Sequence, residues 1–366
     1  MTTINAPTLL LEYAENAFEN VQPVGFIIVG DRKSPDDKII KITKRLEEFG
    51  YDSHYLSVKE QDEYLKKSHP KLSKIIPYDS DNRRNVGYIY AKDLGAKRII
   101  NIDDDNYVDP ESNYFLSHRI VGLTRKLPEM KSSNNWFNPC ELLDLEPKLQ
   151  LYMRGFPLNK RAFSPTLLMT KMREHRIALN MGLWYEDPDI DAFSSIFAPI
   201  KSNGMMDDME EYGNVVLARG TYSPINSQNT CFDVRILPAY YFTIQNMIID
   251  GAPIDRYGDI WQGFFVKKVM DRMNDYVAIG NPMTIHRRNS HDYLKDMKLE
   301  YAGLLLTPRL IDFLDNIDLM SDTYSGCYIE IAEEIESANL GDEKGVKEFQ
   351  KKLSDNMRIW VEEVER

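Results

Sequence analysis

Three consecutive aspartates, Asp103, Asp104 and Asp105, follow the apolar run Ile99–Ile102. Adjacent like charges repel one another, so a folded chain needs a reason to keep them together. A divalent cation bound to a phosphate supplies such a reason, because Mg²⁺ and Mn²⁺ prefer carboxylate oxygens and bridge to substrate phosphates. Ligands of open α/β sheets bind at the carboxyl ends of strands, which is where these residues stand. The pattern predicts a metal–phosphate site, with a solvated acidic turn as the alternative.

The spacing of the outer two aspartates limits this predicted site. Alternate residues of an extended segment point to opposite faces, so Asp103 and Asp105 can face one ligand only if the chain turns there. His286, in the stretch Thr284–His291, could complete a metal site begun by carboxylates elsewhere. A lone histidine is more often structural or exposed, so both interpretations of His286 stay open.

Basic residues gather in Arg154–Arg161, and more follow as far as Arg176. Pro157 disfavours a regular helix through the first of these segments. In an acidic chain this local concentration could face a diphosphate, since arginine forms bidentate pairs with phosphate oxygens. Ordinary surface charge explains the same pattern equally well.

Turn-forming residues between Asp250 and Gly258 lead towards an apolar run that starts at Phe264 and predicts a helix. Asp259 caps this helix in one interpretation. In the other it orients a sugar hydroxyl or acts as a base. Trp261 either stacks on a sugar or belongs to the core, and the spacing alone does not decide.

The elements that must position these residues alternate between strands and helices. The expected order is a strand over Val24–Val29, a helix that begins at Pro35 with Ser34 as its cap and ends at Gly50, a strand over Tyr51–Leu56, a helix over about Asn82–Leu94, and a strand over Arg98–Ile102. A repeated strand–helix–strand order predicts a mostly parallel sheet with helices on its faces.

Composition and charge narrow the class of protein. The chain has 366 residues, 43% of them hydrophobic, so it can build a full core. A net charge of −12 argues against a general electrostatic grip on nucleic acid or an anionic membrane, although a basic groove around Arg154–Arg176 would permit a nucleic-acid acceptor. No apolar segment reaches the length of a membrane span, and Met1–Asn20 lacks the basic region of a secretory signal. We expect a cytoplasmic protein with no membrane partner.

Several separated motifs, taken in order, resemble the reversibly glycosylated polypeptide family, whose plant members are UDP-arabinopyranose mutases. The resemblance covers about Ile99 to the C-terminus and is specific because the motifs keep their order. The corresponding segments are Ile102–Asp105 for IDDD, Arg154–Arg161 for RGYPFSLR, Met181–Ala192 for HGLW…PDYDA, Gly220–Asp233 for GT…P…N…FD, Asp250–Trp261 for DGQPIGRYDDMW, and His286 for the histidine of WHSKAS.

The N-terminal third is less close to the plant proteins. Gly30–Pro35 and Tyr78–Tyr88 resemble a second group, the STELLO-type glycosyltransferases. Both groups look like nucleotide-sugar enzymes of the Rossmann-like GT-A fold, which agrees with the α/β, mostly parallel sheet expected above. The resemblance implies a GT-A-like nucleotide-sugar-binding catalytic domain over residues 1–300. A C-terminal helical extension over residues 301–366 would pack on it.

The resemblance also implies roles for individual residues. Asp103, Asp105 and His286 would bind Mn²⁺ or Mg²⁺. Arg154 or Arg161 would be the site of reversible self-glycosylation, and Asp259 is the third catalytic candidate. A UDP-sugar would lie against the remaining candidates, which are Asp31, Asn82, Arg83, Arg84, Asp104, Trp184, Asp233, Arg256 and Trp261.

Two departures from the family motifs keep the reaction open. Gly258 stands for the first aspartate of RYDDMW, and Met181 for the histidine before GLW. The leading hypothesis is a UDP-sugar mutase of the arabinopyranose–arabinofuranose type with reversible self-glycosylation. The second is a glycosyltransferase that moves a sugar such as arabinose or glucose to a saccharide, protein, lipid or modified nucleic-acid acceptor. The third is a non-catalytic subunit that only binds a nucleotide sugar, in a homo- or hetero-oligomer assembled through the C-terminal helices.

Overall fold

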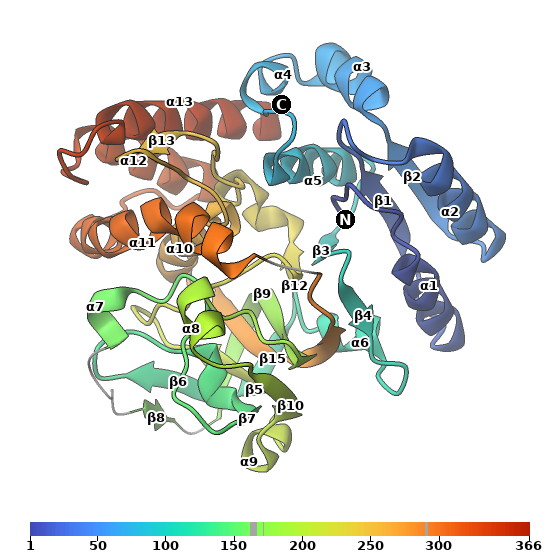
Figure 1. The fold of residues 1–366 in the computed structure, drawn as a ribbon, viewed down its shortest axis with the longest axis horizontal. Helices are drawn as coiled ribbons and strands as arrows, with labels where there is room; N and C mark the ends of the chain where they lie inside the picture. The colour runs from blue at the N-terminus through green and yellow to red at the C-terminus, as the bar shows by residue number, and fades with distance from the viewer. Residues whose placement is uncertain (162–166, 171, 290–291) are drawn as a thin grey trace.

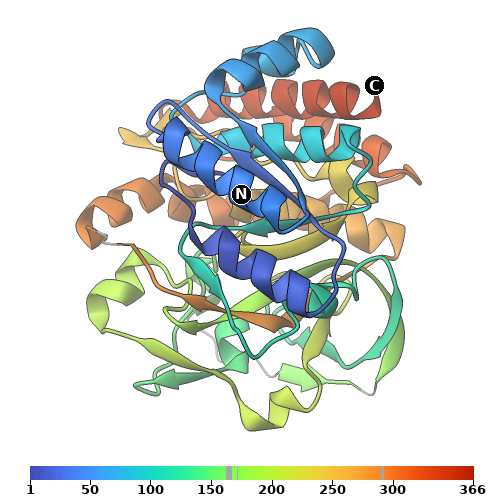
Figure 2. The same ribbon diagram turned by 90° about the vertical axis from the view of Figure 1, so that its right-hand side faces the viewer.

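The N-terminal part of the molecule is a strand–helix–strand unit, as predicted. The computed structural model describes residues 1–161, 167–170, 172–289 and 292–366. Helix α1 (Leu9–Glu19) precedes strand β1 (Gly25–Val29), helix α2 (Asp36–Glu48) and strand β2 (Asp52–Leu56). Strands β1 and β2 pair in parallel, and Figure 2 shows this unit facing the viewer.

The helix and strand that lead to the triple aspartate also lie where the sequence predicts them. Helix α3 (Val58–Ser68) begins with a capping box between Ser57 and Glu60. The helix expected over 82–94 is a short 3-10 turn followed by an α-helix, and β3 has the predicted bounds. The elements in chain order are α4 (Leu72–Ile75), η1 (Asp81–Arg83), α5 (Arg84–Asp93) and β3 (Arg98–Ile102).

The large sheet is mixed, so the expectation of a mostly parallel sheet is wrong. Among the described residues, eleven strands are hydrogen-bonded together, and the main order is β3-β12-β9-β15-β11-β6-β8. Along this path β9 with β15 and β11 with β6 are parallel, while the other four neighbouring pairs are antiparallel. The bounds are β4 (Asn106–Val108), β5 (Thr124–Leu127), β6 (Glu129–Ser132), β7 (Leu143–Glu146), β8 (Leu167–Met169), β9 (Arg173–Glu186), β10 (Lys201–Met205), β11 (Asn214–Leu217), β12 (Asn229–Asp233) and β15 (Tyr276–His286).

The reason for this error is a long-range pairing. Local strand–helix–strand order suggests that β3 joins β1 and β2 in one sheet. Instead β3 pairs antiparallel with β12, from Ile102 opposite Asn229 to Arg98 opposite Asp233. Strand β12 therefore lies between β3 and β9, and β1 and β2 form a separate two-stranded sheet. Hydrophobic periodicity reports elements and not their partners, so it could not predict this arrangement.

Four long helices cover the side of the sheet that is uppermost in Figure 1. They are α10 (Gly258–Met273), α11 (Tyr293–Asn316), α12 (Tyr324–Ser337) and α13 (Val346–Glu365). The apolar residues of the last helix, including Phe349, Leu353 and Trp360, are buried in the largest core cluster, which also contains residues of the sheet. Residue 300 lies inside α11, and the division into residues 1–300 and 301–366 stays a prediction.

Short helices and strands connect the strands of the large sheet. They are α6 (Tyr114–His118), η2 (Pro139–Leu142), α7 (Leu158–Arg161), α8 (Ala192–Phe197), α9 (Asp207–Glu210), η3 (Val234–Ala239), β13 (Ile248–Ile249) and β14 (Ala252–Pro253). Over the described ranges, no helix is both long and apolar enough to cross a membrane.

Candidate functional site

Seven of the predicted site residues line one small polar pocket with a volume of about 140 Å³. They come from widely separated segments, namely the start of α5, the end of β3, the loop before α7, the start of α10 and the end of β15. The seven are Arg84, Asp103, Asp105, Arg154, Arg256, Asp259 and His286. These segments meet at one pocket because the large sheet brings the ends of β3 and β15 to the same region.

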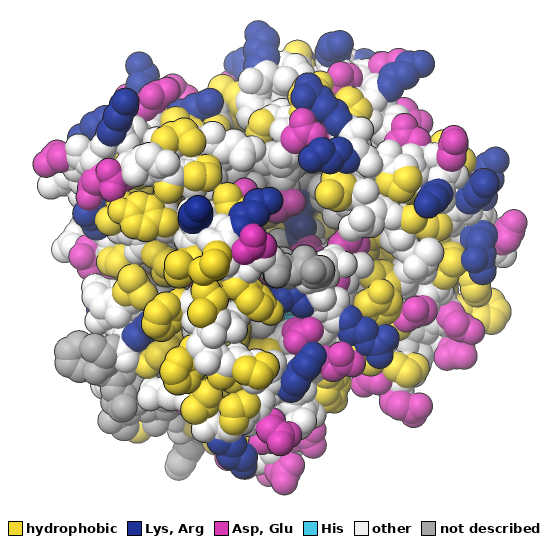
Figure 3. Space-filling view, viewed as in Figure 1, with side chains coloured by type: hydrophobic (Ala, Val, Ile, Leu, Met, Phe, Trp, Pro, Cys, Tyr) yellow, Lys and Arg dark blue, Asp and Glu magenta, His cyan; other side chains and the backbone are white. Residues whose placement is uncertain are grey.

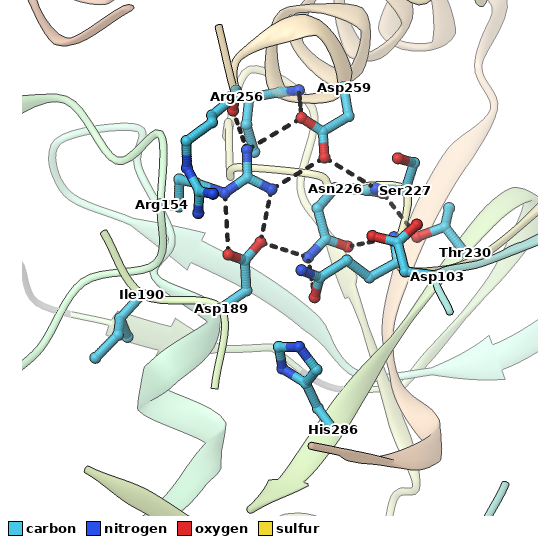
Figure 4. Close-up of polar contacts among 12 residues, drawn as sticks. Asp103, Arg154, Asp189, Ile190, Asn226, Ser227, Thr230, Arg256, Asp259 and His286 are labelled. Atoms are coloured by element: carbon cyan, nitrogen blue, oxygen red, sulfur yellow. Dashed lines mark hydrogen bonds and ion pairs between the residues drawn. The ribbon is translucent and has the colours of Figure 1, made fainter. Parts of the chain in front are cut away.

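Arg154 is the centre of a buried ion-pair network, drawn in Figure 4. Its Nε and Nη2 atoms donate to the two carboxylate oxygens of Asp189 at 3.0 and 2.9 Å. Its Nη1 and Nη2 atoms donate to the carboxylate of Asp259 at 3.1 and 3.0 Å. Burial alone would lower the pKa of Arg154, but the two carboxylates raise it well above its ordinary value. The guanidinium is therefore held charged and fixed in direction.

The two aspartates are held in turn by the segment before β12. The side chain of Asn226 donates to Asp189 at 2.7 Å, and the backbone N–H of Ser227 donates to Asp259 at 3.3 Å. Burial would raise the pKa of Asp189, but the adjacent Arg154 guanidinium lowers it to about 2. Asp189 is thus a charged acceptor. Asp259 lines the pocket, whereas Asp189 is not among its lining residues.

A glycine lets the Arg154 loop approach α10 this closely. Gly155 has φ +88°, and a Cβ atom at this position would lie 2.4 Å from Cγ2 of Ile260. A side chain here would be strained and would also clash with the first turn of α10. The Arg-Gly pair in this segment is therefore explained by packing against the helix that carries Asp259.

Arg161 has a comparable arrangement outside the pocket. It forms an ion pair with Asp191, donates to the carbonyl of Phe156 at 3.2 and 3.0 Å, and lies over the ring of Tyr152. Asp191 also caps α8 by accepting from the N–H of Ser194. The two arginines of the motif therefore pair with Asp189 and Asp191, which lie on one short segment.

Sequence reasoning missed these two aspartates as partners. The available signal was that buried arginines require carboxylates. Arg154 and Arg161 lie in one segment, and Asp189 and Asp191 lie in another. The two pairs could have been matched because buried arginines require carboxylates.

The triple aspartate divides between two environments. The chain turns after β3, with the N–H of Asn106 donating to the carbonyl of Asp103 at 3.2 Å, so Asp103 and Asp105 line the same pocket. Asp104 faces away and accepts from Thr3 and Asn5 at 2.5 and 2.9 Å. The condition that the chain must turn is confirmed, while Asp104 holds the N-terminal segment in place.

Asp103 contacts a cation of the protein itself. Nη2 of Arg84 donates to its carboxylate at 2.7 Å. Burial raises the pKa of Asp103 to about 6, against the lowering effect of Arg84 and with a further increase from Asp105. Burial thus disfavours the charged form of this carboxylate, and an added cation would favour it.

The carboxylate oxygens of Asp103 and Asp105 and the imidazole of His286 are groups that can bind a cation such as Mg²⁺ or Mn²⁺. The Nε2 atom of His286 lies 3.5 Å from Asp105, while its Nδ1 atom contacts the carbonyl oxygen of Asp187. A backbone carbonyl at one ring nitrogen is the usual support for a histidine that offers the other nitrogen to a metal. Across the part of the chain that the structure describes, no group of three or more carboxylates, histidines and cysteines is assembled as a metal site. A cation here would need oxygens from a ligand or water.

Three predicted nucleotide-binding residues lie outside this pocket. Asp31 lines a separate surface pocket of about 580 Å³ beyond β1 and β2. Asn82 donates to the carbonyls of Phe242 and Thr243 at 3.1 and 2.7 Å and so holds a pocket-lining loop. Arg83 is buried, donating to Gln61 at 2.8 Å and lying over the ring of Tyr78.

The two tryptophans and Asp233 also lie away from the pocket. Trp184 and Trp261 are 0% and 1% exposed, and Nε1 of Trp261 donates to Thr307 at 2.9 Å. This placement favours the core interpretation that the sequence left open for Trp261. Asp233 caps η3 and forms an ion pair with Arg235 at 3.0 Å.

Sequence comparison adds a second line of evidence. A family described as "Reversibly glycosylated polypeptide" matches residues 3–366, which includes the N-terminal third. A Zea mays protein named "Probable UDP-arabinopyranose mutase 1" is 29% identical over 348 residues, covering 93% of this chain and 84% of the maize protein. "UDP-arabinopyranose mutase 2" of Arabidopsis thaliana is 28% identical over 298 residues, covering 80% of this chain and 74% of its own.

Proposed function

Because the chain belongs to the reversibly glycosylated polypeptide family, we propose that it is a UDP-sugar mutase. In this proposal the enzyme interconverts the pyranose and furanose forms of UDP-arabinose and is reversibly glycosylated itself. The relatives named as UDP-arabinopyranose mutases over most of the chain are the observation that carries it. The convergence of the motif residues on one pocket supports it.

The donor site in this proposal is a GT-A-like arrangement. Asp103 and Asp105 would hold Mn²⁺ or Mg²⁺ together with diphosphate oxygens, because such ions are commonly bound by one or two carboxylates plus substrate phosphates. His286 is oriented to assist, since one ring nitrogen contacts Asp187 and the other faces Asp105. When bound, the ion would neutralise charge on the departing diphosphate. The nucleoside would extend towards the neighbouring pocket that Asp31 lines.

The change of ring size requires the bond between the anomeric carbon and the diphosphate oxygen to break. UDP leaves with the bonding electrons, and a nitrogen of Arg154 bonds to the anomeric carbon. Because this guanidinium is charged at rest, the nitrogen gives its proton to Asp259, which touches both of its terminal nitrogens at 3.1 and 3.0 Å. The sugar ring opens and recloses through its other hydroxyl. UDP then returns to displace Arg154, and the leaving nitrogen takes its proton back from Asp259. No co-reactant is consumed.

Arg161 is the second candidate for the glycosylated residue. It has its own carboxylate partner in Asp191, but it does not belong to the residues that line the pocket. Cytoplasmic location and assembly through the C-terminal helices are further parts of the proposal. The location rests on the sequence features described above, and the assembly rests on the family resemblance.

A glycosyltransferase acting on an external acceptor is the second candidate. One observation favours it. Beside the hollow in the face shown in Figure 3 lies a group of hydrophobic side chains, and exposed aromatic residues on α8 and α11 contribute to the surface. The α8 residues Phe193 and Phe197 are 64% and 71% exposed, and Tyr301 of α11 is 42% exposed. Such rings could bind the faces of an acceptor sugar.

Incubation with UDP-arabinopyranose and Mn²⁺ tests the proposal. We expect UDP-arabinofuranose as product and a pentose covalently attached to the protein, with both lost after chelation by EDTA and restored by Mn²⁺. Arg154→Lys and Arg161→Lys, compared by peptide mass analysis, assign the attached residue. Absence of both the furanose and the protein label would refute the mutase. Label transfer to an added acceptor without ring isomerisation would support the transferase instead.

A further inference from the structure

The arginines that line the pocket differ in how closely each guanidinium is paired with a carboxylate. Arg84 contacts Asp103 at 2.7 Å, Arg154 contacts Asp189 and Asp259 within 3.0 Å, and Arg256 contacts Glu300 at 3.0 Å. Each of these three guanidinium groups has a close carboxylate. They therefore shape the pocket and have limited capacity to take a new anion.

Arg288 is the exception within the described residues. Its Nη1 atom lies 3.3 Å from the hydroxyl of Ser195, and its Nη2 atom lies 3.4 Å from the carbonyl of Ile190. The carboxylate that its guanidinium contacts is that of Asp189, at 3.9 Å, and Asp189 is already engaged by Arg154. The side chain is only 10% exposed. A charge that is this buried and this loosely paired is costly unless a ligand supplies the missing anion.

The backbone holds Arg288 at the pocket edge. Its N–H donates to the carboxylate of Asp187 at 3.1 Å, and the carbonyl of Asp187 contacts His286. Arg288 lies two residues after His286, the last residue of β15, and lines the pocket with Asp103 and Asp105. An anion held by the aspartates through a cation would lie within the same small volume as this guanidinium.

We propose that Arg288 binds the diphosphate of the nucleotide sugar. A guanidinium presents paired N–H groups that match phosphate oxygens, and its charge stabilises the pair of electrons that UDP takes when the bond to the anomeric carbon breaks. This inference rests on the proposed function, because it assigns a residue to the leaving group of that reaction. It also gives a reason for a loosely paired arginine beside Arg154, whose charge Asp189 and Asp259 already balance.

The chain supplies a matched control in the preceding residue. Arg287 is 58% exposed, lies over the ring of Tyr107 and contacts Glu186 at 3.3 Å, and it is not among the pocket-lining residues. Removing it changes the net charge of the protein by the same amount as removing Arg288. A general electrostatic effect would affect both variants equally, whereas a direct phosphate contact would affect only one.

Calorimetric titration of the full chain with uridine, UMP and UDP in the presence of Mg²⁺ tests the assignment. We expect Arg288→Ala to weaken UDP binding by about 10- to 100-fold, the value of a lost charge-assisted contact, and to leave uridine binding unchanged. Arg288→Lys should give an intermediate loss, because lysine keeps the charge without the paired geometry. Arg287→Ala should bind all three ligands as the unmodified protein does. The ratio of UDP to UMP losses tells which phosphate is contacted.

Two results separate failure of this inference from failure of the proposed function. If the unmodified protein binds UDP and Arg288→Ala or Arg288→Lys binds it equally well, the assignment to Arg288 is refuted while the nucleotide-sugar site stands. If Arg288→Ala does not fold, as judged by its melting temperature, the Arg288→Lys variant decides in the same way. If the unmodified protein binds neither uridine nor UDP, the proposed function fails, and the inference fails with it.

Discussion

Replacing Asp189 by asparagine removes a buried charge while nearly keeping the shape of the side chain. Asp189 is 1% exposed and accepts from Nε and Nη2 of Arg154 and from the side chain of Asn226. An asparagine would present an NH₂ group where a carboxylate oxygen now accepts. At least one donor would then face another donor, and Arg154 would keep only Asp259 as a paired carboxylate.

The size of the effect follows from the pKa of Asp189. Its lowering from 3.8 to about 2 in the folded protein corresponds to about 2.5 kcal/mol of stability at neutral pH. Breaking a buried ion pair by removing one partner costs about 3–5 kcal/mol in general. We therefore expect Asp189→Asn to lower the free energy of unfolding by about 3 kcal/mol at pH 7.

Urea unfolding at several pH values measures this loss, with Asp144→Asn as the control. Asp144 is 40% exposed and lies 3.9 Å from Lys148, so its replacement should cost no more than about 1 kcal/mol. Folding lowers the pKa of Asp189, so its contribution is complete above the unfolded value near 4 and is lost as the pH falls towards 2. The difference between the unmodified protein and Asp189→Asn should close over that range.

Two outcomes would contradict this reasoning. A loss at pH 7 that equals the loss in Asp144→Asn would show that the Arg154 network contributes no more than a surface pair. A difference that stays constant as the pH falls below 4 would show that the effect of the substitution comes from packing and not from the charge of Asp189.

Two further substitutions test local packing. Gly155→Ala should lower the free energy of unfolding by more than about 3 kcal/mol, because a left-handed φ costs about 1–2 kcal/mol and the added Cβ would lie 2.4 Å from Ile260. Gly50 is the control, since it has a similar φ with no atom within 4 Å of an added Cβ. Gly50→Ala should therefore lose only the conformational part of that free energy. Trp261→Phe should lower the melting temperature through the lost contact with Thr307 and leave UDP-sugar affinity unchanged, whereas reduced sugar affinity at an unchanged melting temperature would support the stacking role.

Elements with strong local signals were predictable from the sequence. Strand β3 has its predicted bounds, and α5 lies within the helix that was expected before it. The partners of these elements were not predictable, because β3 pairs with a strand far along the chain. The same limit applies to the site. Residue types pointed to Asp103, Arg154 and His286, which the fold brings to one pocket, while no periodicity pointed to Arg288.

The pairing of Arg154 with Asp189 and Arg161 with Asp191 gives the two arginines different reasons to be present. Asp189 and Asp191 lie on one short segment, and an isolated bridge between Met153 and Ile190 places that segment against the Arg154 loop. Arg154 reaches the pocket through this contact, whereas Arg161 contacts the residue that caps α8. If Arg154 is the glycosylated residue, loss of Arg161 would act on the ligand through the position of α8 and its neighbour Arg288, which contacts Ser195 of that helix. If replacing either arginine lowered the activity equally, the effect at Arg154 would then come from a chemical role and the effect at Arg161 from a positional one.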